Sequence, residues 1–216
     1  MKILLFCYFN GSGGKFIANC LSYSKQVAFP NYEKLSAIQA DDSLKLLEKS
    51  LLDTIPDKSN ARQWLQLEQG CIQLFGEAIT HVRTGKDVAG AEINNFDQFD
   101  AMWLPLMCHN QQELENYKAF FVDAEIFTVL VDGDPKFIDL AIRKKWPNDH
   151  HCIDLDAYKL FKEEMVSVDF DFCFPNWNPL ILENHNMIKH LACNIGIKFD
   201  INLSNNYIKK YVDFHL

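Results

Sequence analysis

The sequence has no long hydrophobic run, no basic cluster and no closely spaced cysteine pair, and each absence excludes a class of protein. The apolar stretch from Ile3 to Phe9 is far shorter than the about 18 residues of a membrane helix, so we expect no membrane span. It is also too short for the core of a secretion signal, and we interpret it as a buried strand. With 29 acidic residues, 21 basic residues and a net charge of −8, the composition argues against a nucleic-acid partner.

The seven cysteines are odd in number, and none forms a Cys-x-x-Cys pair. A disulfide framework or a zinc site is therefore not expected, and we predict buried free thiols in a protein of the reducing cytoplasm. Internal repeats and low-complexity segments are also lacking. At 216 residues the chain is long enough for one sizeable core, so we predict a single domain over residues 1–216.

The most informative feature is a strand, a glycine-rich turn and a helix within the stretch Lys2 to Ser24. The apolar strand is followed by the turn Asn10 to Lys15, which reads NGSGGK, and then by apolar residues at helical spacing. Such a unit directs backbone N–H groups and a helix N-terminus at an anion. Lys15, at the mouth of the turn, would add a positive charge. We interpret the turn as an anion-binding loop; a tight turn that binds nothing is the alternative.

The turn differs from the phosphate-binding loop of ATP- and GTP-binding proteins, whose motif is Gly-x-x-x-x-Gly-Lys-Ser/Thr. When Gly14 and Lys15 are aligned with its Gly-Lys pair, Phe9 replaces the first glycine and Phe16 replaces the Ser/Thr. The hydroxyl that would hold Mg²⁺ is therefore missing. This favours a donor whose transfer needs no metal, such as a sulfuryl donor, and we expect no metal ion.

Two further strands are predicted, at Ala101 to Cys108 and at Glu125 to Val131, the second rich in β-branched and aromatic residues. Helical patterns follow them, one beginning near Pro135. This alternation predicts an α/β fold of three layers, a parallel central sheet with helices on both faces. His109 and Asp132 come directly after these strands, so both should lie beside the glycine turn at the carboxyl edge of the sheet, where ligands bind.

Three stretches make the chain resemble the sulfotransferase family, which uses 3′-phosphoadenosine 5′-phosphosulfate as its donor. LLFCYFNGSGGKFIANCL resembles the family's 5′-phosphosulfate loop, MWLPLMCHNQQEL its strand ending in a catalytic histidine, and EIFTVLVDGDPKFIDLAIRKKW its later strand, turn and helix. The resemblance implies in-line transfer of a sulfuryl group to a hydroxyl or amine, with His109 as general base and Lys15 stabilising the transferred group. It implies a donor site formed by Gly11, Ser12, Gly13, Gly14, Lys15, Phe16, Asp132 and Arg143.

Asp132 departs from the family pattern, in which an arginine ends the later strand and a serine lies on the following helix, both holding the 3′-phosphate. Here the strand ends in an aspartate, and the helix position near Ala141 has no hydroxyl. Two explanations remain open. In the one we favour, Asp132 caps the helix that begins near Pro135, and Arg143 or Lys144 supplies the positive charge. In the other, the donor has no 3′-phosphate, and Asp132 contacts a ribose hydroxyl or an acceptor amine.

Two other functions are compatible with these residues. A P-loop kinase or nucleotide-binding protein would need a Mg²⁺ ligand, and Ser12 carries the only hydroxyl of the turn. A sulfotransferase-like fold that has lost catalysis and serves in binding or assembly would account for Asp132. The acceptor, a small molecule, carbohydrate or peptide, is expected between a helical insert at about 32–95 and the segment at about 148–179. Helices at about 180–215 complete the predicted domain, and the sequence leaves the oligomeric state open.

Overall fold

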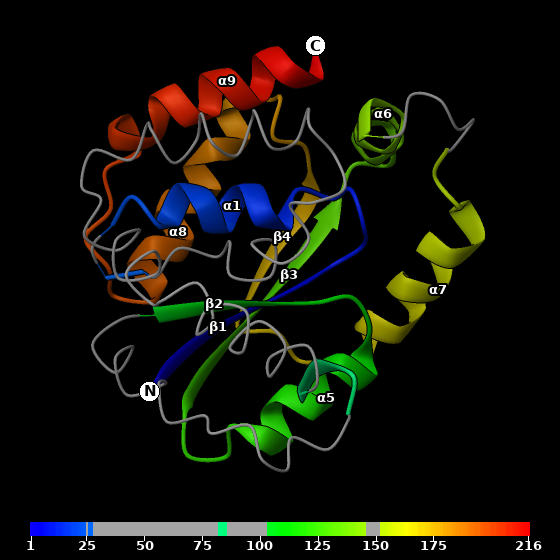
Figure 1. The fold of residues 1–216 in the computed structure, drawn as a ribbon, viewed down its shortest axis with the longest axis vertical. Coiled ribbons are helices and arrows are strands. Elements are labelled where there is room, and N and C mark those ends of the chain that lie inside the picture. The colour runs from blue at the N-terminus through cyan, green and yellow to red at the C-terminus, as the bar shows by residue number, and fades with distance from the viewer. Residues whose placement is uncertain (25, 28–81, 86–102, 146–151) are drawn as a thin grey trace, which may run out of the picture.

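A computed structural model describes residues 1–24, 26–27, 82–85, 103–145 and 152–216 (Figure 1). The predicted helical insert at about 32–95 lies outside these residues, apart from residues 82–85. The described strands are β1 (Lys2–Tyr8), β2 (Trp103–Cys108), β3 (Glu125–Gly133) and β4 (Phe172–Trp177). The described helices, numbered as in Figure 1, are α1 (Gly14–Leu21), α5 (Gln111–Phe120), α6 (Pro135–Lys145), α7 (Leu155–Val166), α8 (Asn186–Asn194) and α9 (Asn205–His215), with 3-10 helices at Leu182–His185 and Ile201–Ser204.

The described strands form one parallel sheet in the order β2-β1-β3-β4, and β1 is central because its side chains are apolar on both faces. All its residues from Ile3 to Tyr8 are buried, as expected for a parallel strand covered on both sides. Lys2 lies opposite Trp103 of β2 and Glu125 of β3, so the three strands start and end nearly level. Their carboxyl ends therefore meet at one edge of the sheet, together with the turn that follows β1.

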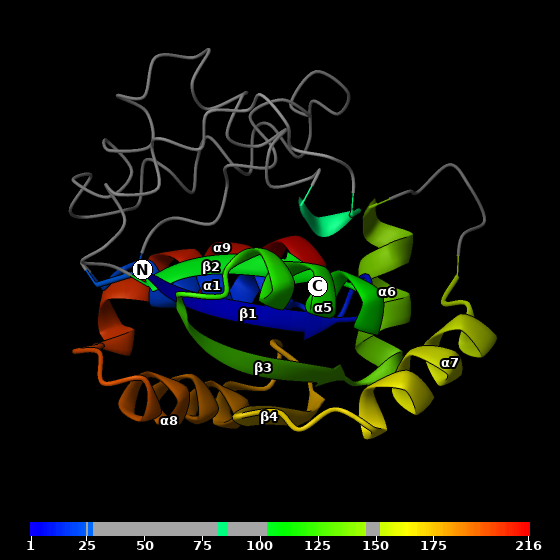
Figure 2. The ribbon, with the colours of Figure 1, turned by 90° about the horizontal axis from the view of Figure 1, so that it is seen from below.

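Helices cover both faces of this sheet. Figures 1 and 2 show α1 and α9 on one side and α5 on the other, with α7 on the side of α5; α8 packs against α1. The chain passes from β1 to β2 in one direction and returns past β1 to β3, so right-handed crossovers place α1 and α5 on opposite faces. The predicted α/β fold, a parallel sheet between two layers of helices, is confirmed.

The side chain of Phe16 ties α1 to the C-terminal part of the chain. Its ring centroid lies 4.5 Å from that of Tyr211 and 5.5 Å from that of Tyr207, both on α9, and 6.3 Å from that of Trp177 in β4. One turn further along α1, Asn19 donates a hydrogen bond of 3.0 Å to the hydroxyl of Tyr207. These buried contacts hold α1, and with it the preceding turn, against β4 and α9.

Two features differ from the sequence-based expectations. The segment at about 148–179, expected only as part of an acceptor pocket, contains α7 and β4. The prediction of buried thiols is right for Cys7, Cys20 and Cys108 but wrong for Cys152, Cys173 and Cys193, which are exposed; all six are free. Within the described ranges, no helix is long and apolar enough to span a bilayer.

Candidate functional site

The turn between β1 and α1 is built on two glycines in left-handed conformation. Gly11 has a φ of 90° and Gly13 a φ of 79°, values that cost other residues free energy. The N–H of Ser12 donates a hydrogen bond of 2.9 Å to the carbonyl oxygen of Phe9, and α1 begins at Gly14. The predicted strand, turn and helix are therefore present, and the N-terminus of α1 opens at the carboxyl edge of the sheet.

Two buried polar atoms lie beside the turn without a hydrogen-bond partner among the described residues: Oγ of Ser12 and Nε1 of Trp177. A Cβ added to Gly13 would lie 3.2 Å from the indole nitrogen of Trp177, and one added to Gly133 would lie 2.8 Å from the hydroxyl of Ser12. A hydroxyl and an indole N–H can each donate a hydrogen bond to an anion. The turn therefore has two unused donors next to its backbone N–H groups.

His109 directly follows β2 and is held in a defined tautomer. Its Nδ1 lies 3.0 Å from the carbonyl oxygen of Tyr8, which can only accept a hydrogen bond. Nδ1 therefore carries the proton in the neutral ring, and Nε2 keeps its lone pair. The backbone N–H of His109 donates a 2.8 Å hydrogen bond to Oε2 of Glu113 on α5, which fixes the start of that helix against the strand.

The charge state of His109 follows from its surroundings. Burial lowers the pKa of the imidazole, and the positive charges of Arg83 and Lys15 lower it further, against the raising effect of the Tyr8 carbonyl and Glu113. The ordinary histidine pKa is about 6.5, so the ring is neutral at pH 7. A neutral imidazole with a bare Nε2 can accept a proton, which is the requirement for a general base.

Arg83 is a second cation near His109 that the sequence did not point to. It lies in the short described segment at residues 82–85, and its Nε is 3.8 Å from Oε1 of Glu113. Its carbonyl oxygen accepts a 2.8 Å hydrogen bond from Asn116 of α5. In the sequence, Arg83 falls within the expected insert at about 32–95, and no local pattern indicates a pairing with residues about 30 positions away. Lys15 and Arg83 each place a positive charge near His109, and Glu113 places a negative charge there.

Asp132 does not cap the helix that begins near Pro135, so the explanation that we favoured from the sequence is wrong. Its Oδ1 accepts a 2.8 Å hydrogen bond from the hydroxyl of Tyr158, and its Oδ2 lies 3.0 Å from Nζ of Lys162, both on α7. The cap is Asp134, whose Oδ1 accepts a 2.9 Å hydrogen bond from the N–H of Lys136. Lys162 thus offsets the charge of Asp132, and the sequence did not predict this pairing.

Arg143 pairs with a neighbour on its own helix, α6. Its Nε lies 2.8 Å from Oδ2 of Asp139, and 63% of its side chain is exposed. Lys144 lies close enough to α9 to lower the pKa of His215. The carboxyl edge therefore brings the glycine turn, Lys15 and His109 together, while Asp132 faces α7. This arrangement can hold an anion next to a neutral base.

The comparisons with known proteins do not identify a family. The chain matches no protein-family model and no curated protein. Among solved structures, it is similar to an unliganded sugar kinase from Janibacter sp. HTCC2649, with 10% sequence identity and a TM-score of 0.41, over 93% of this chain and 98% of that one. At this level the similarity carries no functional argument.

Proposed function

We propose that this chain transfers a sulfuryl group from 3′-phosphoadenosine 5′-phosphosulfate to a hydroxyl or amine of an acceptor. The observation that carries the proposal is the neutral His109, whose Nε2 keeps its lone pair near Lys15 and the glycine turn. Transfer from an anionic donor requires a positively charged cradle for the donor and a base for the acceptor's proton. The carboxyl edge of the sheet supplies candidates for both.

In the proposed reaction the acceptor atom attacks sulfur, the bond from sulfur to the phosphate oxygen breaks, and adenosine 3′,5′-bisphosphate leaves with the bonding electron pair. Nε2 of His109 takes the proton of the acceptor. Lys15 and the backbone N–H groups of Gly13 and Gly14 stabilise the negative charge on the leaving phosphate. The buried hydroxyl of Ser12 is a further donor next to this cradle.

The surroundings of Phe16 support a donor that is held without a metal ion. Its ring is buried and packs against Tyr211, so this position, the place of the Mg²⁺-binding hydroxyl in kinases, offers no oxygen. Asp132 and Asp134, the carboxylates at the end of the neighbouring strand β3, already accept hydrogen bonds from side chains of α7 and the loop after β4. A kinase reaction would have to displace these contacts.

In this proposal the 3′-phosphate of the donor is assigned to Lys162. Its pairing with Asp132 offsets the charge of that carboxylate, and 48% of the lysine side chain is exposed. A lysine is a mobile point charge that can reach a phosphate without breaking a rigid bidentate contact. Arg143, paired with Asp139 on α6, has no part in the proposed donor site.

Thermal shift with three conditions separates the candidate functions: adenosine 3′,5′-bisphosphate, ATP with Mg²⁺, and buffer. A stabilisation with the bisphosphate alone supports sulfuryl transfer, because a ligand that binds only the folded state raises its stability. A shift with ATP and Mg²⁺ alone would instead indicate a kinase. No shift with either would indicate a binding protein without catalysis.

Two variants then test the assigned roles. Lys15→Ala should weaken bisphosphate binding by about tenfold or more, the scale of one charge-assisted hydrogen bond. Lys189→Ala, at an exposed position on α8, is the matched control and should bind as the wild type does. His109→Gln should lower the rate by about 10² or more and leave bisphosphate affinity unchanged. Unchanged affinity in Lys15→Ala would refute the anion-binding turn, and an unchanged rate in a folded His109→Gln would refute the base.

A further inference from the structure

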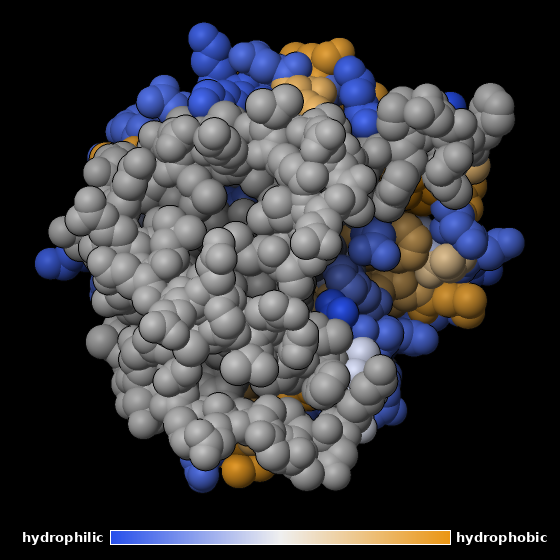
Figure 3. All heavy atoms as spheres, in the orientation of Figure 1, coloured by the Kyte–Doolittle hydropathy of each residue, from blue (hydrophilic) through white to orange (hydrophobic). Residues whose placement is uncertain are grey.

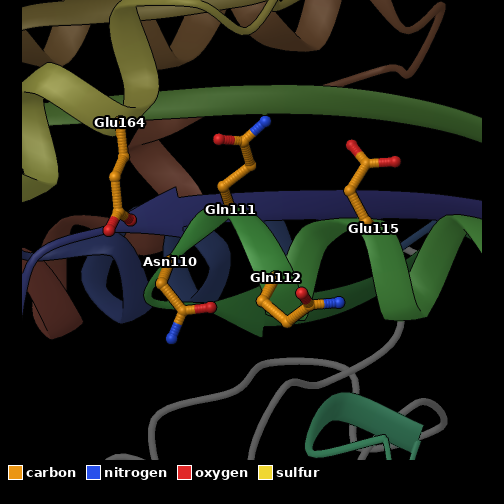
Figure 4. A pocket seen from close by; sticks show the side chains of 5 residues that line it. All are labelled: Asn110, Gln111, Gln112, Glu115 and Glu164. Atoms are coloured by element: carbon orange, nitrogen blue, oxygen red, sulfur yellow. The ribbon is translucent and has the colours of Figure 1, made fainter.

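A polar hollow of ≈ 460 Å³ lies between the start of α5 and the C-terminal half of α7, close to the carboxyl edge of the sheet (Figure 4). Among the described residues, its lining contains three carboxamides and two carboxylates and no basic residue. The lining residues are Asn110, Gln111, Gln112, Glu115 and Glu164. Asn110, one of the lining residues, directly follows His109 in the chain and is the N-cap of α5.

The side chains that line this hollow come from the start of α5 and from α7. Figure 4 shows Gln111 and Glu115, four residues apart on α5, extending toward the side from which Glu164 descends. Figure 3 shows hydrophilic side chains where α5 and α7 approach each other, beside the more hydrophobic outer surface of α7. The hollow is thus a polar surface between α5 and α7, distinct from the exposed apolar residues of α7 such as Leu160.

The two carboxylates are available to a ligand. Within the described residues, Glu164 has no ion-pair or side-chain hydrogen-bond partner, and the side chain of Gln111 has no hydrogen-bond partner. Glu115 lies 3.5 Å from Nζ of Lys118, but 53% of the glutamate side chain is exposed, and an exposed pair of this kind holds its partners weakly. Gln112 is more firmly placed, through a 3.0 Å hydrogen bond that it donates to Asn116.

We infer that this hollow binds a small hydroxyl-bearing molecule that carries a protonated amine. Carboxylates that lack a firm partner favour an ammonium group, and carboxamides both donate to and accept from hydroxyls. The net charge of −8 opposes anionic ligands but attracts a cation over a longer range. The assignment of the hollow as the acceptor site rests on the proposed sulfuryl transfer. An ammonium paired with a glutamate of this lining has no lone pair, so the group that reacts is a hydroxyl of the same molecule.

The experiment measures the binding of glucosamine and of glucose to the full chain by isothermal titration. The two sugars differ by an amine in place of one hydroxyl, so their difference in affinity reports the charge. We expect glucosamine to bind about two- to fivefold more tightly, the scale of an ion pair with an exposed carboxylate. Glu164→Gln should remove most of this preference. Glu163→Gln, the matched control, changes the neighbouring carboxylate of α7, which lies 3.9 Å from Lys159 and 61% exposed, and should leave the preference intact.

Equal affinity for both sugars, absence of binding, or an equal effect of Glu163→Gln and Glu164→Gln would overturn the inference. Titration with adenosine 3′,5′-bisphosphate on the same samples separates it from the proposed function. If glucosamine binds in a way that depends on Glu164 but adenosine 3′,5′-bisphosphate does not bind, the amine site is supported and the proposed sulfuryl transfer is refuted. If the bisphosphate binds but glucosamine is not preferred over glucose, the proposed sulfuryl transfer is supported and the amine site is refuted.

Discussion

Gly14 lies so close to the ring of Tyr8 that it leaves no room for a side chain. Its backbone conformation is one that any residue can adopt, so only the lack of a side chain explains the glycine. A Cβ added there would lie 2.3 Å from Cδ1 of Tyr8 and 2.7 Å from Cγ and Cε1 of the same ring. The ring is buried and lies edge-on to His109, with the two centroids 4.7 Å apart. Gly14→Ala must therefore displace Tyr8 and, through it, His109.

The expected magnitude follows from these distances. The new Cβ would lie about 1.1 Å inside the ordinary contact distance of 3.4 Å, so the ring has to move by about that amount. Forcing an extra methyl group into a packed site costs about 1–3 kcal/mol in the free energy of unfolding. Alanine gains up to about 1 kcal/mol over glycine in a helix, so we expect a net loss of about 1–2 kcal/mol. A displacement of about 1 Å at the proposed base should also lower the rate by about 10²-fold.

A double-mutant cycle measures this contact. Gly14→Ala and Tyr8→Ala are made singly and together, and the free energy of unfolding is obtained from urea titrations. Removal of the ring frees the space, so Gly14→Ala in the Tyr8→Ala background should be neutral or slightly stabilising. Gly196→Ala is the control: its φ of 68° strains the backbone, but nothing lies within 4 Å of its Cβ, so its cost should be the same in both backgrounds. An equal destabilisation by Gly14→Ala with and without the Tyr8 ring would refute the reasoning.

Acidification should destabilise the protein, because burial lowers the pKa of His109, His185 and His215 in the folded state. The unfolded chain then binds more protons, so the melting temperature should fall as the pH drops below about 6.5, and a flat profile would contradict these environments. Lys162→Met should weaken binding of adenosine 3′,5′-bisphosphate by about fivefold or more but leave adenosine 5′-phosphate unchanged, whereas Asp132→Asn should strengthen bisphosphate binding. Equal effects of each variant on both ligands in isothermal titration would exclude a contact with the 3′-phosphate.

The elements that the sequence predicted well are those set by local pattern. The apolar run at Ile3 to Phe9 became β1, ending one residue earlier, and the glycines at 11 and 13 have the positive φ values that a turn into a helix needs. His109 could be placed because parallel strands end at a common edge. Each of these inferences needs only neighbouring residues and the geometry of a parallel sheet.

The features that the sequence missed depend on contacts between distant segments. The pairing of Asp132 with Lys162 spans 30 residues, and no periodicity connects the two positions. The helix α7 had a signal that could have been used, because its buried residues Tyr158, Phe161 and Met165 recur at helical spacing. Several exposed apolar side chains on the same helix blur that pattern. The cap at Asp134 could also have been predicted, since it stands directly before Pro135, the first residue of α6.

The central place of β1 also governs the order in which the chain can fold during synthesis. β1 leaves the ribosome before both of its partners, since Lys2 pairs with Trp103 and Glu125, about 100 and 120 residues later. At about 5–20 residues per second, β1 therefore waits for about 6–25 s before β3 can join it. Until β2 is made, this largely apolar segment exposes unpaired N–H and C=O groups on both edges, and one edge stays unpaired until β3 follows. Unpaired edges of this kind can pair with another nascent chain. β1 thus stays incompletely paired until β3 is made, and a ribosome that stalls before Gly133 leaves an aggregation-prone product.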